Sequence, residues 1–298
     1  MSRLRDYIVA LGDLFMPRVC LACGRRLGMR ERHLCLSCAA DVPYTRFWLA
    51  SHNPLADRFN AVLERHRGIE PMDYAYAAAL IYYKGAYRSI PRALKYHGDL
   101  AAGRHYGALL GRRLAAAPHF ADIDLVIPVP LHWTRLRARG YNQAEILARA
   151  LVDAFRAART ALAPAAAAPA PGAPEEGPVG TGRGEGPEVR TDLLVRARRT
   201  RTQTRVSVDQ KAQNVASAFQ VPERFPLWGR LLSLSKDAPG APAAVLASAR
   251  HILLVDDTYT TGATLYACYA TLRPYTNARI SIATLAAVEG ATAPSPGP

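Results

Sequence analysis

From about residue 74 onwards, short apolar runs alternate along the chain with longer segments whose apolar positions recur at helical spacing. The runs are of strand length, and the segments between them are long enough for helices. Such alternation is typical of an α/β fold, in which helices cover both faces of a parallel sheet. Strands are expected at 77–83, 123–130, 252–255 and 278–287, and helices at 88–96, 100–116, 142–157 and 265–272.

The chain before residue 74 has a different pattern. Residues 17–45 hold four of the five cysteines, so 1–45 is expected to form a small separate module. Residues 46–73 show little periodicity and are expected to be a connector. An amphipathic helix is predicted within 1–16 from apolar residues at helical spacing, which are Leu4, Ile8, Leu11 and Phe15.

The α/β domain is expected to span 74–289, with two interruptions and a disordered tail at 290–298. Residues 160–190 are rich in Ala, Pro and Gly and contain almost no larger apolar residue. Such a segment cannot bury enough surface to offset the entropy of ordering it, which predicts a disordered insertion. A shorter break at about 235–248 is interpreted as a loop, because the pattern resumes after it.

No apolar run reaches the roughly 18–20 residues that a membrane-spanning helix needs. The apolar stretch at 7–15 is short, is broken by Asp13 and is not followed by a small-residue cleavage site. We therefore expect a cytoplasmic protein with no membrane span. Thiols stay reduced in that compartment, so paired cysteines are considered first as metal ligands.

The cysteines of the N-terminal module have the spacing of a structural zinc site. They form a CxxC–x11–CxxC pattern made of Cys20, Cys23, Cys35 and Cys38. Four thiolates can close a tetrahedral Zn²⁺ site, and a segment too small for its own core gains stability from a metal. A redox CxxC pair is the alternative, but it would be expected on a βαβ unit, which is not visible here. Cys268 is expected to be a small core residue, and His33 a surface residue.

An apolar run at 252–255 ends in two adjacent acids, Asp256 and Asp257, followed by a loop rich in threonine and glycine. In an open α/β sheet, ligands bind at the carboxyl ends of the strands. A loop that leads into a helix offers free N–H groups and a positive dipole end to a phosphate. The acids are suited to a ribose diol or to Mg²⁺ held by it. The remaining loop residues are Thr258, Thr260, Thr261, Gly262, Ala263 and Thr264.

This segment resembles the phosphoribosyl-diphosphate motif of type I phosphoribosyltransferases. In that family the acids bind the ribose hydroxyls and the threonine-glycine loop binds the 5′-phosphate. The resemblance implies that Asp256 and Asp257 are the catalytic acids. A buried strand that ends in a capped turn is the alternative, but it would not require two acids, three threonines and a glycine at these positions.

A second group of polar residues follows the strand expected at 123–130. Arg135, Arg137 and Arg139 precede a glycine, and a helix then begins near Asn142. Guanidinium groups at this spacing suit an anion such as pyrophosphate, although a solvated basic turn has the same composition. The formal charge of +14 also favours polyanionic partners. An arginine bias of this kind also arises from codon composition alone.

Together these elements resemble the ComF family of competence-related proteins, in which a zinc-ribbon-like module precedes a phosphoribosyltransferase-type domain. The most specific element is Arg-Gly-Tyr-Asn-Gln at 139–143. The resemblance implies anion contacts at Lys95, Arg137, Arg139, Arg196 and Lys211. Lys211 stands where the family usually has an arginine, and it lacks the planar pair of donors.

Two functions follow as hypotheses. In the first, the protein binds Mg²⁺–phosphoribosyl diphosphate and transfers the ribose phosphate to an acceptor, which needs positioning and charge neutralisation more than a covalent nucleophile. No Ser-His-Asp arrangement is evident from the sequence. In the second, it is an accessory protein that handles single-stranded DNA, with competence proteins as partners. Aromatic residues for base stacking are sparse near the arginines at 196–205, and most of Tyr82, Tyr83, Tyr87 and Tyr96 are expected to be at least half-buried.

Overall fold

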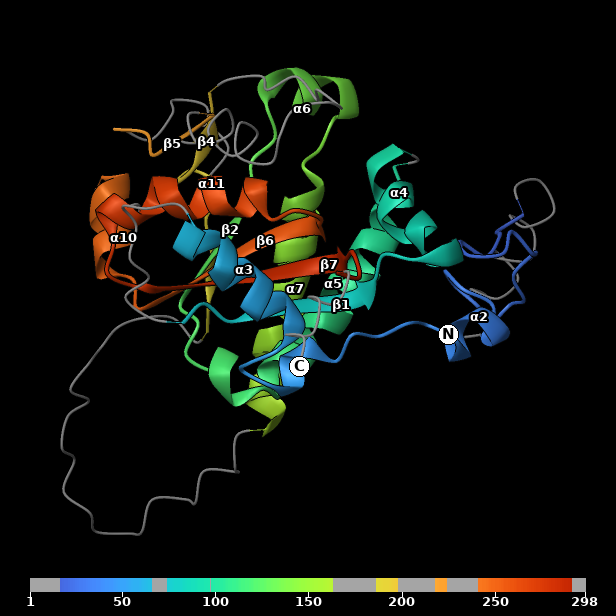
Figure 1. The fold of residues 1–298 in the computed structure, drawn as a ribbon. Coiled ribbons are helices and arrows are strands. Elements are labelled where there is room, and N and C mark those ends of the chain that lie inside the picture. Colours follow the sequence, from blue (N-terminus) through green and yellow to red (C-terminus); the bar gives the residue numbers. More distant parts are fainter. Residues whose placement is uncertain are drawn as a thin grey trace, which may run out of the picture.

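The computed structural model describes residues 17–65, 74–96, 98–162, 186–197, 218–223 and 241–290 (Figure 1). The helix expected at 1–16, Lys211, the tail from residue 291 and most of the insertion expected at 160–190 lie outside these residues. None of the described helices is long and apolar enough to cross a lipid bilayer.

The core of the domain is a five-stranded sheet in which every pair of neighbouring strands is parallel. The strand order is β1-β7-β6-β2-β3, so β6 lies in the middle. This confirms the α/β class and the parallel sheet expected from the sequence. The strands are β1 (Ala77–Tyr82), β2 (Leu125–Pro128), β3 (Glu188–Val189), β6 (His251–Tyr259) and β7 (Arg279–Ala287).

Helices cover both faces of the sheet, as the buried strands require (Figure 1). Alternate residues of β6 point to opposite sides, with Leu254 in one apolar cluster and Leu253 in the other. The first cluster contains α3 (Pro54–Arg65) and α11 (Ala263–Leu272). The second contains α4 (Ser89–Tyr96), α5 (Leu100–Ala115) and α7 (Gln143–Leu162).

Several segments differ from the sequence-based expectation. The connector expected at 46–73 contains η1 (Phe47–Leu49) and α3, and α3 buries Leu55, Phe59 and Leu63 in the core. The loop expected at 235–248 contains α10 (Pro242–Ser248). The basic turn after β2 is a helix, α6 (Trp133–Arg139). Other short elements are α2 (Leu36–Ala40), η2 (Gly85–Arg88), η3 (Pro118–Phe120), β4 (Val195–Arg196), β5 (Phe219–Gln220) and η4 (Arg273–Tyr275).

The expected insertion is shorter than 160–190. Helix α7 continues to Leu162, and β3 at the far end of the segment pairs with β2 as the last strand of the sheet. Strands β4 and β5 pair with each other in a separate antiparallel sheet beside α11.

The N-terminal module is attached to the edge of the sheet at β1. Tyr44 forms an antiparallel bridge with Ile81, and the backbone N–H of Thr45 donates to the Leu80 carbonyl at 3.2 Å. The backbone N–H of Tyr82 donates to the Pro43 carbonyl at 2.8 Å. The segment at 43–45 therefore satisfies part of the edge of β1 that no sheet strand covers.

Helices α5 and α7 pack closely because α5 presents glycines toward its neighbour. A Cβ atom added at Gly111 would lie 2.1 Å from the Leu151 carbonyl oxygen of α7. A Cβ atom at Gly103 would instead meet the Leu94 side chain at 2.6 Å. An added methyl group would therefore meet rigid backbone at Gly111, but only the end of a flexible side chain at Gly103.

We therefore predict that Gly111→Ala lowers the free energy of unfolding by about 1–3 kcal/mol, as overpacking does in a close-packed interior. Helix propensity alone predicts the opposite sign, because alanine favours a helix over glycine by about 1 kcal/mol. Gly103→Ala is the matched variant and should cost less. Denaturant unfolding measures both, and equal effects at the two positions would contradict the packing explanation.

Candidate functional site

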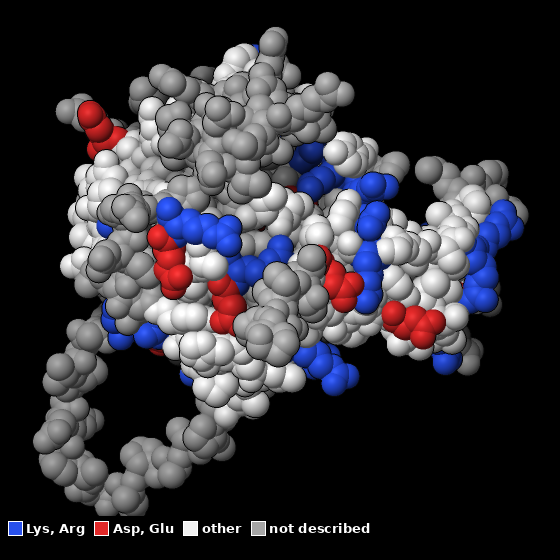
Figure 2. Space-filling model, viewed as in Figure 1, with Lys and Arg blue, Asp and Glu red and all other residues white. Residues whose placement is uncertain are grey.

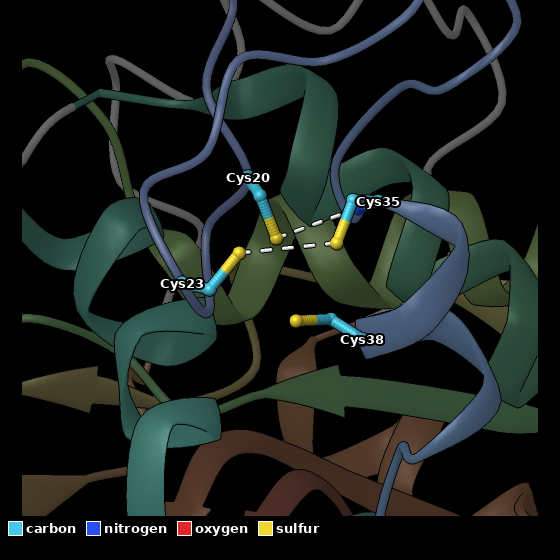
Figure 3. Close-up of side chains that lie close together, drawn as sticks. All are labelled: Cys20, Cys23, Cys35 and Cys38. Carbon is cyan, nitrogen blue, oxygen red and sulfur yellow. Dashed lines mark hydrogen bonds between the residues drawn. The ribbon is translucent and has the colours of Figure 1, made fainter.

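The four cysteines of the N-terminal module point toward a common centre (Figure 3). Their sulfur atoms all lie within 4.8 Å of one another. The Sγ atoms of Cys23 and Cys35 are 3.8 Å apart, and all four residues are free thiols. A tetrahedron with Zn–S bonds of about 2.3 Å has sulfur–sulfur edges of about 3.8 Å, so this arrangement is compatible with a structural zinc ion.

Backbone N–H groups orient the sulfur ligands. The N–H of Cys35 donates to the Cys20 sulfur at 3.4 Å, and the N–H of Gly24 donates to the Cys20 carbonyl at 2.9 Å. Burial opposes ionisation of the Cys20 thiol, but hydrogen bonds from the backbone at Cys23 and Cys35 outweigh it and lower its pKa to about 6. The hydrogen bond with Cys35 is the first cause that raises the pKa of Cys38 to about 12. A thiolate is the form that binds a metal, so without a metal the fold favours the ligating state of Cys20 but not that of Cys38.

His33 links this module to the α/β domain and is not the surface residue expected from the sequence. Its ring is half-buried, with its centroid 5.0 Å from that of His105 and 6.0 Å from that of Tyr106, both on α5. Tyr87 of η2 adds a second link, because its hydroxyl donates to the Cys38 carbonyl at 2.9 Å. The module therefore contacts the domain through side chains as well as through the edge of β1.

A second group of polar residues lies at the carboxyl ends of β6 and β2, which are neighbours in the sheet. From β2 the chain continues outward to β3, whereas from β6 it continues in the opposite direction to β7. Open α/β sheets form a crevice at such a reversal of strand order, and ligands bind there. Asp256 and Asp257 lie at this position near the end of β6.

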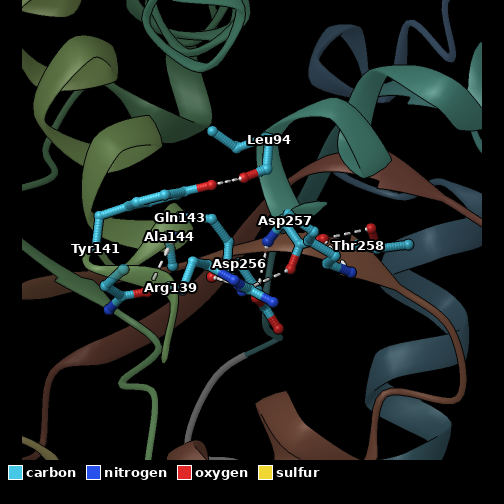
Figure 4. Close-up of polar contacts among 10 residues, drawn as sticks. Leu94, Arg139, Tyr141, Gln143, Ala144, Asp256, Asp257 and Thr258 are labelled. Atoms are coloured by element: carbon cyan, nitrogen blue, oxygen red, sulfur yellow. Dashed lines mark hydrogen bonds and ion pairs between the residues drawn. The ribbon is translucent and has the colours of Figure 1, made fainter. Parts of the chain in front are cut away.

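The carboxylate of Asp257 is held by three side chains from different elements (Figure 4). The Nζ atom of Lys95 on α4 lies 2.5 Å from Oδ2, and the Thr258 hydroxyl donates to the same oxygen at 2.7 Å. The Nε2 atom of Gln143 on α7 donates to Oδ1 at 3.3 Å. Only 5% of the Asp257 side chain is exposed, so this charge is largely removed from water.

The pKa values of Lys95 and Asp256, which lie next to this carboxylate, are both shifted upward. Burial lowers the pKa of Lys95, but the Asp257 charge outweighs it and the net shift is upward. Burial, and next the neighbouring charge of Asp257, raises the pKa of Asp256 to about 8. Asp257 is thus held in an ion pair with Lys95, whereas the raised pKa of Asp256 opposes its ionisation at neutral pH.

Each residue of the Arg-Gly-Tyr-Asn-Gln segment at 139–143 makes a different contact or ends or begins a helix. Arg139 donates to Oε1 of the Gln143 side chain, and its guanidinium lies 6.0 Å from the centre of the Tyr96 ring. Gly140 ends α6 with φ of +83°, which favours glycine. The Tyr141 hydroxyl donates to the Leu94 carbonyl. Asn142 accepts from the N–H of Ala144 at 3.1 Å, which caps α7, and donates to the Val129 carbonyl at 3.1 Å.

The loop between β6 and α11 leads directly into a helix N-terminus. Strand β6 continues to Tyr259, beyond the expected end at residue 255, so the loop itself is confined to residues 260–262. Gly262 has φ of +81°, and a Cβ atom there would lie 2.6 Å from the Tyr259 hydroxyl. Thr260 and Thr261 are exposed, and Thr264 is half-buried in the first turn of α11.

Arg58 of α3 supports this loop and was not identified from the sequence. Its guanidinium donates to the Thr260 carbonyl at 3.1 Å and to the Val288 carbonyl at 2.8 Å. It also lies over the Tyr259 ring at 5.2 Å. The two contacts are more than 200 residues away along the chain, so no local pattern marks this role.

The predicted anion contacts fall into three groups. Lys95 and Arg139 lie at the acidic pair, as described above. Arg196 of β4 lies over the Phe219 ring at 5.1 Å. Burial, and next the charge of Arg135, lowers its pKa, and the charge of Asp256 acts in the opposite direction. Arg137 is exposed on α6 and lies over the Trp133 ring at 5.3 Å, away from the acids.

A Ser-His-Asp series with a buried serine and histidine and an exposed aspartate, which the sequence did not reveal, lies at the opposite ends of these strands. The His251 ring is 2.7 Å from Asp122 and 2.8 Å from Ser281. Both His251 and Ser281 are fully buried, so no substrate reaches the hydroxyl. The series anchors the starts of β6 and β7. Cys268 is buried in the core, as expected.

In comparisons with known proteins, no family model matches this chain, and a search of curated proteins finds no match.

Removal of the metal is expected to unfold the module at 17–42 and leave the cooperative melting of the α/β domain intact. The cysteines share a small apolar cluster with Leu27, and the module adds Leu21, Leu34 and Val42 to the much larger cluster of the domain. Cys23→Ser should lose bound zinc, whereas Cys268→Ala, in the other core, should keep it. Elemental analysis of protein purified without chelator tests this. Protein without zinc before any treatment would contradict the assignment.

Asn substitutions at the two adjacent acids should have opposite effects on stability. The raised pKa of Asp256 means that folding favours its protonated form, so its stabilising contribution is lost as pH rises from about 4 through about 8. Asp256→Asn should raise Tm at pH 8 by about 2–4 °C and flatten its dependence on pH. Asp257→Asn leaves Lys95 without its carboxylate and should cost about 1–3 kcal/mol. Thermal melts from pH 5 to pH 9 distinguish the two variants. A change of Tm with the same sign in both would refute the unequal roles of the two acids.

Proposed function

We propose that this chain is a phosphoribosyltransferase-type protein of the ComF kind, which binds Mg²⁺–phosphoribosyl diphosphate at the carboxyl end of β6. The observation that carries the proposal is the position of the acidic pair. Asp256 and Asp257 lie at the reversal of strand order and lead, within one short loop, to the N-terminus of α11. Few other ligands combine a diol for the acids with a phosphate for the loop.

The loop suits the 5′-phosphate of this ligand. The first N–H groups of α11 have no partner within the helix, and the helix dipole favours an anion at this end. The hydroxyls of Thr260, Thr261 and Thr264 are available at or near the surface to add hydrogen bonds. Gly262 supplies the left-handed turn that leads into α11, and the Tyr259 hydroxyl lies where a side chain at this position would begin.

The cations around the acids suit the pyrophosphate group. Lys95 pairs with Asp257, Arg139 contacts Gln143 beside that carboxylate, and the charge of Asp256 acts on Arg196. Transfer to an acceptor would form a bond at C1 of the ribose and break the bond from C1 to pyrophosphate. Positioned cations favour that step because they stabilise the charge on the leaving group. Asp256 and Asp257 would hold Mg²⁺ together with the ligand, and the ion would supply further neutralisation of charge.

Titration calorimetry with phosphoribosyl diphosphate and Mg²⁺ tests the site before any reaction is sought. Binding by the native protein should weaken by about 100-fold in the Asp256→Asn/Asp257→Asn double variant, since charged hydrogen bonds contribute about 1.5–3 kcal/mol each. Asp153→Asn, on an exposed part of α7, is the matched control and should bind normally. No binding by folded, zinc-loaded native protein would refute the proposal.

Single-stranded DNA is a second candidate ligand, favoured by two exposed aromatic residues that each lie beneath an arginine. Trp133 is 57% exposed under Arg137, and Tyr96, one of four tyrosines of which most were expected to be at least half-buried, is 74% exposed under Arg139. Bases stack on such rings, and arginines bind phosphates. On the face drawn in Figure 2, the described basic side chains form several groups with neutral and acidic ones between them, which does not favour an extended DNA track.

Electrophoretic shift at increasing salt separates this candidate from the first. DNA binding by stacking and ion contacts should weaken steeply with salt and be lost in Tyr96→Ala/Trp133→Ala. Binding that neither salt nor these substitutions change would exclude the aromatic pairs as the DNA site.

A further inference from the structure

Five side chains around the acidic pair form a closed chain of contacts. Lys95 pairs with Asp257, Asp257 accepts from Gln143, and Gln143 accepts from Arg139. Arg139 then lies over the ring of Tyr96, which follows Lys95 on α4. The chain joins α4, α6 and α7 to β6, and its Gln143–Asp257 contact (Figure 4) links residues 114 positions apart.

Gln143 is the member of this chain whose role requires an amide, because the side chain must donate and accept at the same time. Its Nε2 donates to a carboxylate while its Oε1 accepts from a guanidinium, and the side chain is buried. The reversed amide would place oxygen against oxygen and donor against donor. Glutamate would satisfy Arg139 but repel Asp257, and an apolar residue of the same size would satisfy neither.

The contacts of Gln143 also make the two acids unequal. Asp257 is engaged through both oxygens by Gln143, Lys95 and Thr258. Asp256 makes one contact of this kind, in which its Oδ1 accepts from the N–H of Asp257 at 2.8 Å, and its side chain is less buried. The acid with fewer protein partners is the one that a ligand can reach without first breaking an ion pair.

We propose that Gln143 is a positioning residue that fixes the Asp257 carboxylate and the Arg139 guanidinium, so that Asp257 serves as a fixed charge and Asp256 meets the hydroxyl groups of the bound sugar phosphate. The part concerning the sugar phosphate rests on the proposed function. The part concerning Gln143 concerns the ligand-free protein and can be tested separately.

A support for this role comes from the neighbouring residues of the same segment. Tyr141 bonds to the carbonyl of Leu94, the residue before Lys95, and Asn142 bonds to the carbonyl of Val129 after β2. The backbone on both sides of Gln143 is therefore tied to the elements that carry its partners. Its side chain thus acts from a fixed point.

The ligand-free test is a thermal double-mutant cycle with Gln143→Met, Lys95→Met and the double variant. Both residues act on one carboxylate, so the combined loss of Tm should differ from the sum of the single losses by about 2–4 °C. Gln143→Glu should melt lower than Gln143→Met, because it places a second charge beside Asp257. Additive losses would overturn the positioning role.

The ligand test measures affinity for Mg²⁺–phosphoribosyl diphosphate by calorimetry. Gln143→Met should weaken binding by about 10–100-fold, as loss of a residue behind a ligand contact does. In protein that already carries Asp257→Asn, Gln143→Met should cause no further loss of affinity. Asp256→Asn alone should reduce affinity more than Asp257→Asn alone. Leu147→Ala, buried one turn further along α7, lowers stability without touching the acids and should bind normally.

The outcomes separate the two proposals. Native binding that Gln143→Met leaves within twofold overturns the role of Gln143 and retains the proposed function. A non-additive cycle in a protein that binds no phosphoribosyl diphosphate retains the positioning role and refutes the proposed function.

Discussion

The arrangement around β6 follows from the cost of placing two adjacent carboxylates at the end of a buried strand. A carboxylate removed from water needs charge-bearing or hydrogen-bonding partners, and otherwise it takes up a proton. Both solutions occur side by side, since Asp257 has Lys95, Gln143 and Thr258, and the pKa of Asp256 rises to about 8. The surrounding helices are placed so that their polar residues reach this one point.

The rest of the fold supplies the positions from which these partners act. Close packing of α5 on α7 fixes the helix that begins with Gln143, and the same α5 packs against α4, which carries Lys95. On the other face, Arg58 of α3 ties the loop after β6 to the end of β7. The site is therefore built on packed elements, and the described part of the loop is short. Such a site loses little entropy when a ligand binds.

The features that could be predicted from the sequence are those encoded by neighbouring residues. The four-cysteine cluster, the parallel α/β class and the position of the acidic pair at the end of a strand each depend on a local pattern. Helix α6 was missed because it buries no residue and so has no apolar periodicity. Helix α3 was missed although Leu55, Phe59 and Leu63 recur at four-residue spacing. The partners of Asp257 depend on strand order, which joins Gln143 to a residue 114 positions away, and no local pattern contains that information.

The segment at 43–45 has a consequence for behaviour at high concentration. It occupies part of the outer edge of β1, while the opposite edge of the sheet is the two-residue strand β3. An uncovered strand edge is a template for pairing with a second chain. A metal bound to the four thiolates would hold the module that continues into this segment, and would thereby protect the edge of the sheet from pairing with a strand of another chain. Loss of the metal would then make the protein self-associate at high concentration, even where the melting of the α/β domain is unchanged.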